Sequence, residues 1–467
     1  MTNAARALLG EKGVITAPGD IAPWLSDWRG RYHGRASAIL APQSTVEVAQ
    51  IVALAAEHAV SLVPQGGNTG MVGGGTPDDS GKSVILSLRR MNRIRRLDPE
   101  AGIAVVEAGV ILSNLHEAAA ALGMRFPLSL AAKGSATVGG LVSTNAGGTQ
   151  VLRFGTMRAL VLGIEAVLPP SAAGAGGIWN GLDALKKDNR GYDLNELLIG
   201  SEGTLGVVTA ATVKLVPAIG DRAVAWIGVD DPQAALALLR AFERRSDGIE
   251  SFEIVPAGTM ALVLKHIPGT RPALDGTYPW MVLVELVAAS EAEAKLEALI
   301  ADGYSAGQLR DAAIATSEAQ ANAFWHLRES ISEAERASGP AMQHDISVPV
   351  SAMPRFMVEA AREIETAFPG TTASAFGHLG DGNVHFHVRA PEGAEADEWR
   401  REEGSAASRM VHDLVTAAGG SISAEHGIGQ MKRDELARLS DPVRMGTLRA
   451  IKAGLDPLGI MNPGKLL

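Results

Sequence analysis

The sequence contains no cysteine among its 467 residues. This absence excludes disulfide bonds, thiolate metal ligands, iron–sulfur clusters and a catalytic thiol. A metal site in this chain would therefore have to use histidine, aspartate or glutamate side chains.

Long apolar segments and blocks of like charge are also missing. No stretch approaches the roughly 18 uninterrupted apolar residues of a transmembrane helix. Residues 1–13 lack the apolar core and the cleavage signal of a secretory leader. The formal net charge of -10 repels the phosphate backbone of nucleic acids. We therefore expect a cytoplasmic protein with no transmembrane segment and no nucleic-acid partner.

The composition is that of a globular protein, with 46% hydrophobic and 20% charged residues. The length suits two or three domains of about 100–200 residues each. Residues 36–218 alternate short β runs, helices and many glycines. Residues 219–420 contain less glycine, and their strand–helix–strand rhythm favours a separate α/β domain with antiparallel pairing. Residues 1–35 indicate a short helix and a loop, and residues 421–467 a segment that packs back on the first domain.

Hydrophobic periodicity predicts the individual elements. Strands are expected at residues 36–40, 60–64, 83–88, 103–106, 223–229, 249–254, 280–286 and 384–388. Helices are expected at residues 5–11, 112–122, 232–244 and 291–301, with another that begins after an N-cap at Ser44 or Thr45.

Two glycine-rich segments dominate the first expected domain. Residues 64–75 follow an apolar strand, and residues 127–148 mix glycine with small hydroxyl residues. Glycine lets backbone N–H groups approach a ligand, and successive amides can form a nest for a pyrophosphate. Either segment alone is typical of a set of turns, but the pair favours a nucleotide cradle. Neither segment has the Rossmann or the P-loop spacing, so the cradle belongs to another type.

These segments carry a resemblance to a known group of flavoenzymes. Residues 64–75 resemble the pyrophosphate loop of the vanillyl-alcohol-oxidase and p-cresol-methylhydroxylase superfamily, residues 127–148 its second FAD loop, and residues 197–209 a third FAD-contacting motif. The nearest branch contains the D-lactate, glycolate and D-2-hydroxyglutarate dehydrogenases. The resemblance implies an α+β fold, with a two-subdomain FAD-binding domain of the p-cresol-methylhydroxylase type and an α/β substrate (cap) domain with an antiparallel sheet.

The same resemblance implies the FAD contacts and the mode of attachment. Members with covalent flavin often carry a histidine where this chain has Asn68, so we expect non-covalent FAD. The residues assigned to FAD are Pro64, Gly66, Gly67, Asn68, Thr69, Gly70, Pro127, Gly134, Ser135, Thr137, Gly139, Gly140, Asn145, Gly147, Glu202, Gly206, Val207 and Asn462.

A histidine cluster in residues 377–388 is the expected chemical centre. The turn signal at residues 381–383 can bring His378 and His385 together. Residues 384–388 alternate as a strand, which places His385 and His387 on one face. Two histidines and one carboxylate form a ligand set that leaves metal coordination positions open for a substrate. A single histidine is more often part of the scaffold, and His412 in its apolar helical pattern is interpreted in that way.

The resemblance assigns roles in and around this cluster. It implies His378, His385 and Glu425 as metal ligands and His426 as the catalytic base, with Zn²⁺ as the expected metal and Mn²⁺ as the alternative. Four further residues are assigned to the substrate, namely Arg328, Ser332, Gln343 and His387.

Two of these substrate positions depart from the D-2-hydroxyglutarate enzymes. Arg328 and Ser332 match the residues that hold the distal carboxylate there, and Arg328 is also able to bind a carboxylate through two donors. Gln343 stands where those enzymes have lysine, and His387 stands where they usually have asparagine. The substrate is therefore left open among D-2-hydroxyglutarate, D-malate and D-lactate.

The predicted function is an FAD-dependent dehydrogenase that oxidises a D-2-hydroxy acid to the 2-oxo acid. The metal promotes alkoxide formation, His426 takes the proton, and the C2 hydride passes to flavin N5. An electron-transfer flavoprotein, a quinone or a cytochrome is the expected electron acceptor, and a homodimer is one option for the assembly. The alternatives are a flavin oxidase of the same superfamily acting on another alcohol, and a non-catalytic FAD- or metal-binding module.

Overall fold

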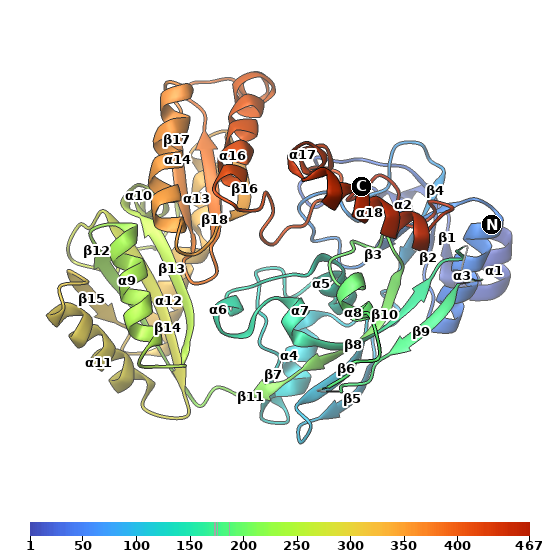
Figure 1. The fold of residues 1–467 in the computed structure, drawn as a ribbon, viewed down its shortest axis with the longest axis horizontal. Helices are drawn as coiled ribbons and strands as arrows, with labels where there is room; N and C mark the ends of the chain where they lie inside the picture. The colour runs from blue at the N-terminus through green and yellow to red at the C-terminus, as the bar shows by residue number, and fades with distance from the viewer. Residues whose placement is uncertain (172–173, 175, 186) are drawn as a thin grey trace. The chain divides into compact units, whose positions relative to one another are not determined.

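The computed structural model describes residues 1–171, 174, 176–185 and 187–467. The chain forms two compact units (Figure 1). Unit 1 comprises Met1–Gly148, Phe154–Ala218 and Glu425–Leu467, and unit 2 comprises Thr149–Arg153 and Ile219–Ala424. The short segment Thr149–Arg153 belongs to unit 2, although it lies within the expected first domain. The glycine-rich sequence around this segment gives no indication of that assignment.

The described residues of unit 1 form two larger sheets and one two-stranded sheet. The first has the order β1-β2-β4-β3, in which β2, β4 and β3 are parallel, and the second is an antiparallel sheet of order β5-β6-β10-β8-β9. Their strands are β1 (Val14–Ile15), β2 (Ala36–Leu40), β3 (Ser61–Gln65), β4 (Ser83–Ser87), β5 (Ile94–Asp98), β6 (Ile103–Glu107), β8 (Val161–Leu168), β9 (Gly177–Gly181) and β10 (Val207–Lys214), and the small sheet pairs β7 (Met124–Arg125) with β11 (Val216–Pro217).

The helices of unit 1 pack on these sheets. Its described helices of four or more residues are α1 (Thr2–Leu9), α2 (Pro18–Ile21), α3 (Thr45–Glu57), α4 (Leu112–Ala120), α5 (Val138–Thr144), α6 (Val151–Phe154, which spans the unit boundary), α7 (Met157–Leu160), α8 (Leu194–Leu198), α17 (Arg433–Leu439) and α18 (Pro442–Leu455). Helix α3 begins at an N-cap, because the Ser44 hydroxyl accepts a hydrogen bond from the Glu47 amide. Its apolar face packs with β2, β3 and β4 in one continuous core.

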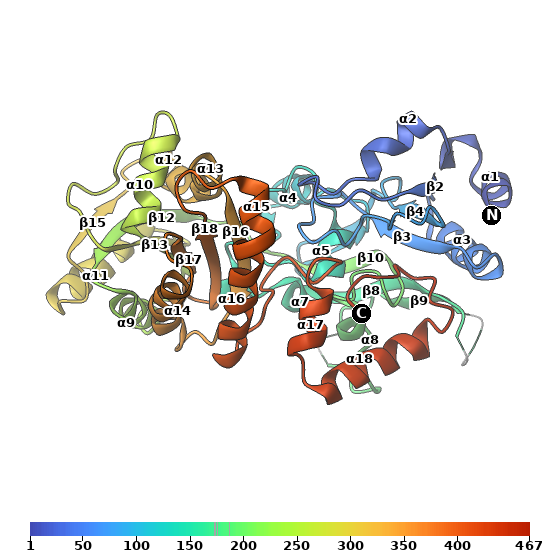
Figure 2. The same cartoon turned by 90° about the horizontal axis from the view of Figure 1, so that it is seen from above.

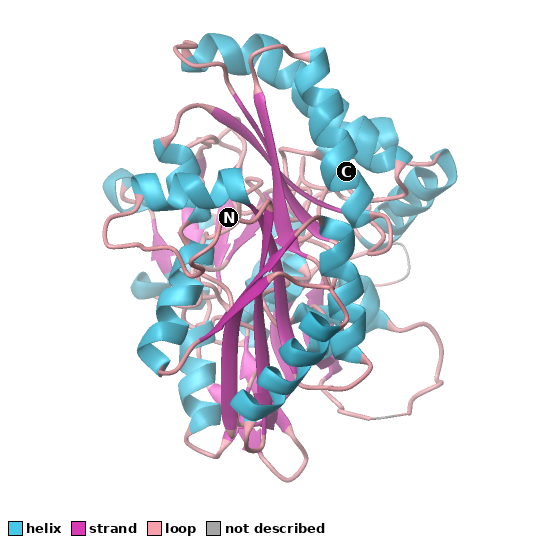
Figure 3. Ribbon diagram, turned by 90° about the vertical axis from the view of Figure 1, so that its left-hand side faces the viewer, coloured by secondary structure: helices cyan, strands magenta, loops and turns pink. Residues whose placement is uncertain are grey.

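Unit 2 contains one seven-stranded sheet in which every neighbouring pair is antiparallel, with the order β15-β12-β14-β13-β17-β18-β16. In Figure 3 its strands are the long magenta arrows in the foreground. They are β12 (Asp221–Val229), β13 (Ile249–Pro256), β14 (Trp280–Ala288), β15 (Asp311–Ile314), β16 (Ala341–Ser347), β17 (Thr372–His378) and β18 (Asn383–Arg389).

Helices cover both faces of this sheet, so the unit is a layered α/β structure with a buried sheet. Figure 2 shows α10 (Ala257–His266), α12 (Glu318–Glu329) and α13 (Ile331–Ala337) on one side of the strands, and α9 (Pro232–Glu243) and α14 (Met353–Ala367) on the other. The remaining helices are α11 (Ala292–Ser305), α15 (Ala396–Trp399) and α16 (Ser405–Ala417). None of the helices in the described part of the chain is both long and apolar enough to cross a membrane.

Two expectations about local structure were wrong. Residues 17–24, expected as a loop because of their prolines and glycine, contain α2, since Pro18 occupies the first helical turn, where its missing N–H costs nothing. The second glycine-rich segment contains α5, so Gly139 and Gly140 are helical. A Cβ at Gly139 would lie 2.6 Å from Ala108 Cβ, which shows that this glycine permits close packing of the helix.

Candidate functional site

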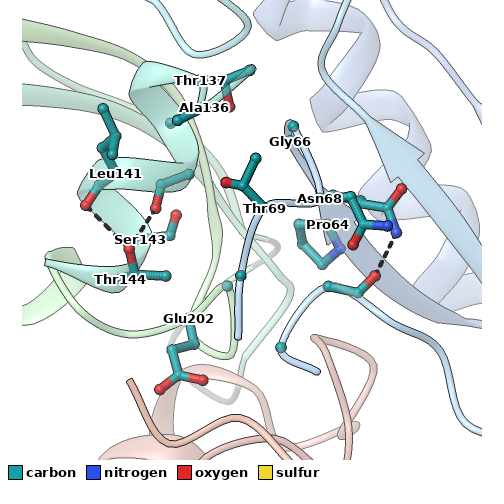
Figure 4. A pocket seen from close by; sticks show the side chains of 18 of the residues that line it. Pro64, Gly66, Asn68, Thr69, Ala136, Thr137, Leu141, Ser143, Thr144 and Glu202 are labelled. Atoms are coloured by element: carbon teal, nitrogen blue, oxygen red, sulfur yellow. Dashed lines mark hydrogen bonds between the residues drawn. The ribbon is translucent and has the colours of Figure 1, made fainter. Parts of the chain in front are cut away.

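Unit 1 contains a cavity between the segment after β3 and the start of α5. Its volume is about 160 Å³. Figure 4 shows Gly66, Asn68 and Thr69 on one side, with Leu141 and Thr144 on the other. The lining residues are Asp27, Pro64, Gln65, Gly66, Gly67, Asn68, Thr69, Gly70, Val72, Gly73, Gly74, Gly75, Thr76, Leu88, Ala108, Ala136, Thr137, Gly139, Gly140, Leu141, Ser143, Thr144, Glu202, Gly203, Gly206, Val207, Val208 and His426.

The two sides of the cavity approach each other through glycine. A Cβ on Gly67 would lie 1.9 Å from the Ser135 carbonyl oxygen, and a Cβ on Gly66 would lie 2.3 Å from Thr137 Oγ1. Any larger residue would push the two segments apart. Asn68 adopts φ of 52° and its Nδ2 donates a hydrogen bond to the Ser26 carbonyl, which anchors the segment to the N-terminal region.

The lining leaves polar groups that fit a polar cofactor. The hydroxyl oxygens of Thr76 and Thr137 are buried and have no hydrogen-bond partner within the described residues. A buried polar atom without a partner is costly unless a ligand or water satisfies it. The unpartnered hydroxyls and the glycine-rich walls suit the pyrophosphate of FAD. The apolar lining residues, such as Leu88, Leu141 and Val208, suit its ring system.

The cavity brings together most of the residues assigned to FAD from the sequence. Those that line it are Pro64, Gly66, Gly67, Asn68, Thr69, Gly70, Thr137, Gly139, Gly140, Glu202, Gly206 and Val207. The assigned residues outside the lining are Pro127, Gly134, Ser135, Asn145, Gly147 and Asn462.

Two of the residues outside the lining have contacts that explain their position. Asn145 ends α5 in a left-handed conformation and its Oδ1 accepts hydrogen bonds from Thr156 and Arg158. Asn462 Nδ2 donates to the carbonyl oxygens of Gly74 and Glu202, at 3.0 Å and 2.7 Å. It therefore connects two segments that line the cavity without lining the cavity itself.

Glu202 connects the cavity with the segment that carries His426. Its two carboxylate oxygens accept hydrogen bonds from the backbone amides of Ile428 and Gly429, both at 2.7 Å. Burial raises the pKa of the Glu202 carboxyl, although these amides and the charge of Lys432 favour its ionised form. Glu202 therefore fixes the residues that directly follow His426, and His426 itself lines the cavity.

Unit 2 holds the histidines of the predicted chemical centre on one face of its sheet. His378 ends β17, His385 lies on β18, and their ring centroids are 5.4 Å apart. His387 lies two residues further on the same strand, on the same face, as the alternation predicts. Glu425 follows unit 2 directly in the sequence and is the first residue of the C-terminal part of unit 1. His412 is buried on α16, where its ring packs against His344.

A buried glutamate, Glu253, joins the cluster to Arg328. Glu253 lies on β13 directly opposite His378. Its Oε1 accepts a hydrogen bond from His378 Nδ1 at 2.7 Å, and its Oε2 accepts one from Arg328 Nε at 2.9 Å. Burial opposes ionisation of Glu253, but its interactions with His378 and Arg328 outweigh burial and lower the pKa of its carboxyl to about 2.

The four residues assigned to the substrate differ in their surroundings. Arg328 is buried with its guanidinium 5.3 Å from the centre of the Phe376 ring, whereas Ser332 is exposed on α13. Gln343 on β16 and His387 on β18 are direct cross-strand partners. The Nδ1 atom of His387 makes a short contact with the carboxylate of Glu335, and both side chains are buried.

Sequence reasoning missed Glu253 and Glu335. They lie 125 and 52 residues from their histidine partners along the chain, so no local spacing connects them. The only available signal was an acidic residue within an apolar strand or on the apolar side of a helix, where an unpaired charge would be unfavourable.

Comparisons with known proteins agree with this architecture. A model of the FAD binding domain matches residues 36–172, and a model of the C-terminal domain of FAD linked oxidases matches residues 220–466. The chain is similar to solved structures of p-cresol methylhydroxylase, with a TM-score of 0.75 and 17% identity over 100% of this chain and 96% of the other. The fold is thus the α+β fold of the flavoproteins related to p-cresol methylhydroxylase, as predicted.

Sequence relatives give the finer grouping. The chain is 35% identical to the mitochondrial D-2-hydroxyglutarate dehydrogenase of Arabidopsis thaliana, over 99% of this chain and 80% of the relative. It is 35% identical to D-2-hydroxyglutarate dehydrogenase of Xanthomonas citri pv. viticola, over 97% and 93%. It is 33% identical to a putative mitochondrial D-lactate dehydrogenase of Schizosaccharomyces pombe, over 98% and 88%. The chain belongs to the FAD-linked oxidase family, in the group of these D-2-hydroxy-acid dehydrogenases, and the predicted enzyme class is confirmed.

Glu202 gives a test of the cavity wall. A Glu202→Gln variant keeps one acceptor oxygen but turns an NH₂ group toward the second backbone amide, which leaves that amide unsatisfied at a cost of about 1–3 kcal/mol. We expect a lower unfolding temperature and faster FAD release, measured by thermal unfolding and by flavin fluorescence. Glu196→Gln, at an exposed position on α8, should change neither. Unaltered FAD release from Glu202→Gln would contradict the role given to Glu202.

Proposed function

We propose that this enzyme binds FAD non-covalently in the unit 1 cavity and oxidises D-2-hydroxy acids with the help of a divalent metal ion. The observation that carries the proposal is the glycine-walled cavity of unit 1, which His426 lines. The two adjacent imidazoles on the sheet of unit 2 support it as a second, separate observation. The relatives, which are named as D-2-hydroxyglutarate and D-lactate dehydrogenases, support the substrate class.

The metal site is proposed from the donor chemistry of this chain. His378 and His385 supply two imidazoles, and Glu425 supplies the carboxylate that completes a three-ligand set with open positions. The hydrogen bond from His378 Nδ1 to Glu253 leaves Nε2, on the opposite side of the ring, as the ligand atom. A metal bound there would supply the Lewis acidity that makes a substrate hydroxyl easier to deprotonate. Zn²⁺ is the proposed ion, with Mn²⁺ as the alternative.

His426 is proposed as the base. It lines the cavity and can accept the hydroxyl proton in the pH range where an imidazole is an efficient base. Loss of this proton and of the C2 hydride converts the 2-hydroxy acid to the 2-oxo acid, with FAD as the hydride acceptor. We further propose that an electron-transfer flavoprotein or a quinone then reoxidises the enzyme.

The substrate class is tested by mixing the oxidised enzyme anaerobically with D- and L-2-hydroxy acids and following flavin absorbance. Only the D enantiomers should bleach the flavin, and a dye acceptor should restore it. His426→Ala should slow the bleaching by roughly 10²–10⁴-fold, the effect typical of a lost general base. Rapid H₂O₂ formation in air would instead indicate a flavin oxidase, and no bleaching by any acid in the panel would refute the proposal.

The metal and the flavin linkage are tested together. Dialysis against a chelator should abolish turnover and remove the metal while FAD stays bound, and acid precipitation should then release FAD into the supernatant. His385→Ala should match the chelated enzyme in elemental analysis and turnover. His412→Ala replaces a buried histidine whose ring packs against His344 and which is not one of the proposed ligands, so this variant should retain the metal. Full turnover in metal-free protein would exclude a catalytic metal.

The distal end of the substrate is expected to meet little net positive charge. Arg328 already pairs with Glu253, and His387 already contacts Glu335. A charged hydrogen bond contributes about 1.5–3 kcal/mol, against about 0.5–1.5 kcal/mol for a neutral one. We therefore propose that this enzyme prefers D-2-hydroxyglutarate over D-lactate or D-malate less strongly than it would with a lysine at position 343.

Gln343→Lys tests this charge argument. The new ammonium group, directly across the strand pair from His387, should raise kcat/KM for D-2-hydroxyglutarate by about tenfold, since 1.4 kcal/mol is a factor of ten. The value for D-lactate should change little. Ala373→Lys places the same charge on the opposite face of the sheet and should have no selective effect. Equal effects on both substrates would show that residue 343 does not contact the distal carboxylate.

A further inference from the structure

We propose that Glu253 is a positioning residue that sets the orientation of the metal ligand His378 and of the substrate residue Arg328 through one carboxylate. This inference rests on the metal site proposed above. It concerns a residue on a strand far from the histidine motif, and it starts from three contacts within unit 2.

The location of Glu253 makes its contacts specific. It is 1% exposed, on β13, and pairs directly with His378 on β17. A carboxylate at such a position is strongly unfavourable unless charged or hydrogen-bonding groups compensate it. Arg328 approaches from α12 and places Nε and Nη2 at 2.9 Å and 2.8 Å from the same oxygen, Oε2. Each carboxylate oxygen thus has a different partner.

The contact with His378 determines which ring nitrogen can bind a metal. A neutral imidazole carries its proton on one nitrogen and a lone pair on the other. Glu253 is an acceptor, so it favours the proton on Nδ1 and leaves the lone pair on Nε2. Carboxylates that accept from the second nitrogen of a metal-bound histidine fix the ring and increase its basicity, and their removal typically weakens metal binding by about 10–100-fold.

The contact with Arg328 couples the substrate side to the same carboxylate. Nε donates to Glu253 and so fixes the plane of the guanidinium. Nη2 lies 2.8 Å from the same carboxylate oxygen but is buried without a hydrogen bond of good geometry to any described residue, so its N–H groups are available to a substrate carboxylate. The ring of Phe376 lies 5.3 Å below the guanidinium and 5.2 Å from the His385 ring, which restricts Arg328 from the other side. A change at Glu253 should therefore alter metal affinity and substrate KM together.

Glu253→Gln separates positioning from simple burial. Glutamine has one acceptor oxygen and one NH₂ group, so it can serve His378 or Arg328 but not both. The matched control is Glu250→Gln on the same strand, because Glu250 is also fully buried and also pairs with an arginine, Arg153, at 2.7 Å. Both variants lose a buried carboxylate, and only the first loses the partner of a metal ligand.

The measurement is competition for Zn²⁺ between a chromophoric chelator and the demetallated, FAD-loaded enzyme. Glu253→Gln should bind Zn²⁺ about 10–100-fold more weakly than wild type and raise KM for the hydroxy acid. Glu250→Gln should retain wild-type Zn²⁺ affinity, and Glu253→Asp, which keeps two acceptors, should recover part of it. Equal affinity in wild type and Glu253→Gln would overturn the role of Glu253. Absence of any Zn²⁺ binding by wild type would instead refute the metal site itself.

A second measurement is made on the wild-type enzyme and does not require the Glu253 variants. Nitrogen-15 NMR of histidine-labelled, metal-free wild-type enzyme at alkaline pH reports which ring nitrogen carries the proton, with the His378 signal assigned from a His378→Asn variant. We expect His378 with Nδ1 protonated. The opposite tautomer, with Nε2 protonated, would overturn the positioning role.

Discussion

The close approach of two chain segments around the unit 1 cavity is the constraint on which the cofactor site depends. The Ser135 carbonyl leaves no room for a side chain at Gly67, and Ala108 leaves none at Gly139. Glycine at these positions lets the segment after β3 and the start of α5 form opposite walls of one cavity. Its conformational freedom would be a cost elsewhere, but here the absence of Cβ is what the packing requires. The glycines thus shape the cavity through steric exclusion as well as through exposed backbone amides.

The C-terminal part of the chain extends the same wall and carries His426, the proposed base. Asn462 binds the carbonyls of Gly74 and Glu202, and Lys452 Nζ donates to the carbonyls of Thr204 and Met461. Three of these four contacts join residues more than two hundred positions apart, so the C-terminal segment takes this course only in the folded FAD-binding unit. Glu202 accepts from the amides of Ile428 and Gly429, so the segment that carries the proposed base is bonded to the same cavity wall.

The sequence predicted the fold class, most strands and much of the cavity wall, because these features have local signals. Alternating apolar residues marked β12, β13 and β18, and clustered glycines marked the segment after β3. Helix α5 was missed because glycine lowers helix propensity. The close packing of Gly139 against Ala108 explains why a glycine stands in this helix. Glu253 and Glu335 were missed because cross-strand and helix-to-sheet partners leave no spacing pattern in one sequence.

The buried carboxylates of unit 2 orient the cationic and imidazole side chains on one face of its sheet. A buried ion pair such as Glu253 with Arg328 contributes little net stability, because desolvation of both groups offsets their attraction. Apolar residues of similar volume would pack such a site at least as well. The pair does supply fixed directions, since one oxygen is directed at His378 and the other at Arg328. The contact of His387 with Glu335 follows the same principle on the neighbouring strand. Because Arg328 and His387 each contact a separate buried carboxylate, this face holds its donor groups in fixed directions, and the carboxylate of Glu253 offsets the charge of Arg328.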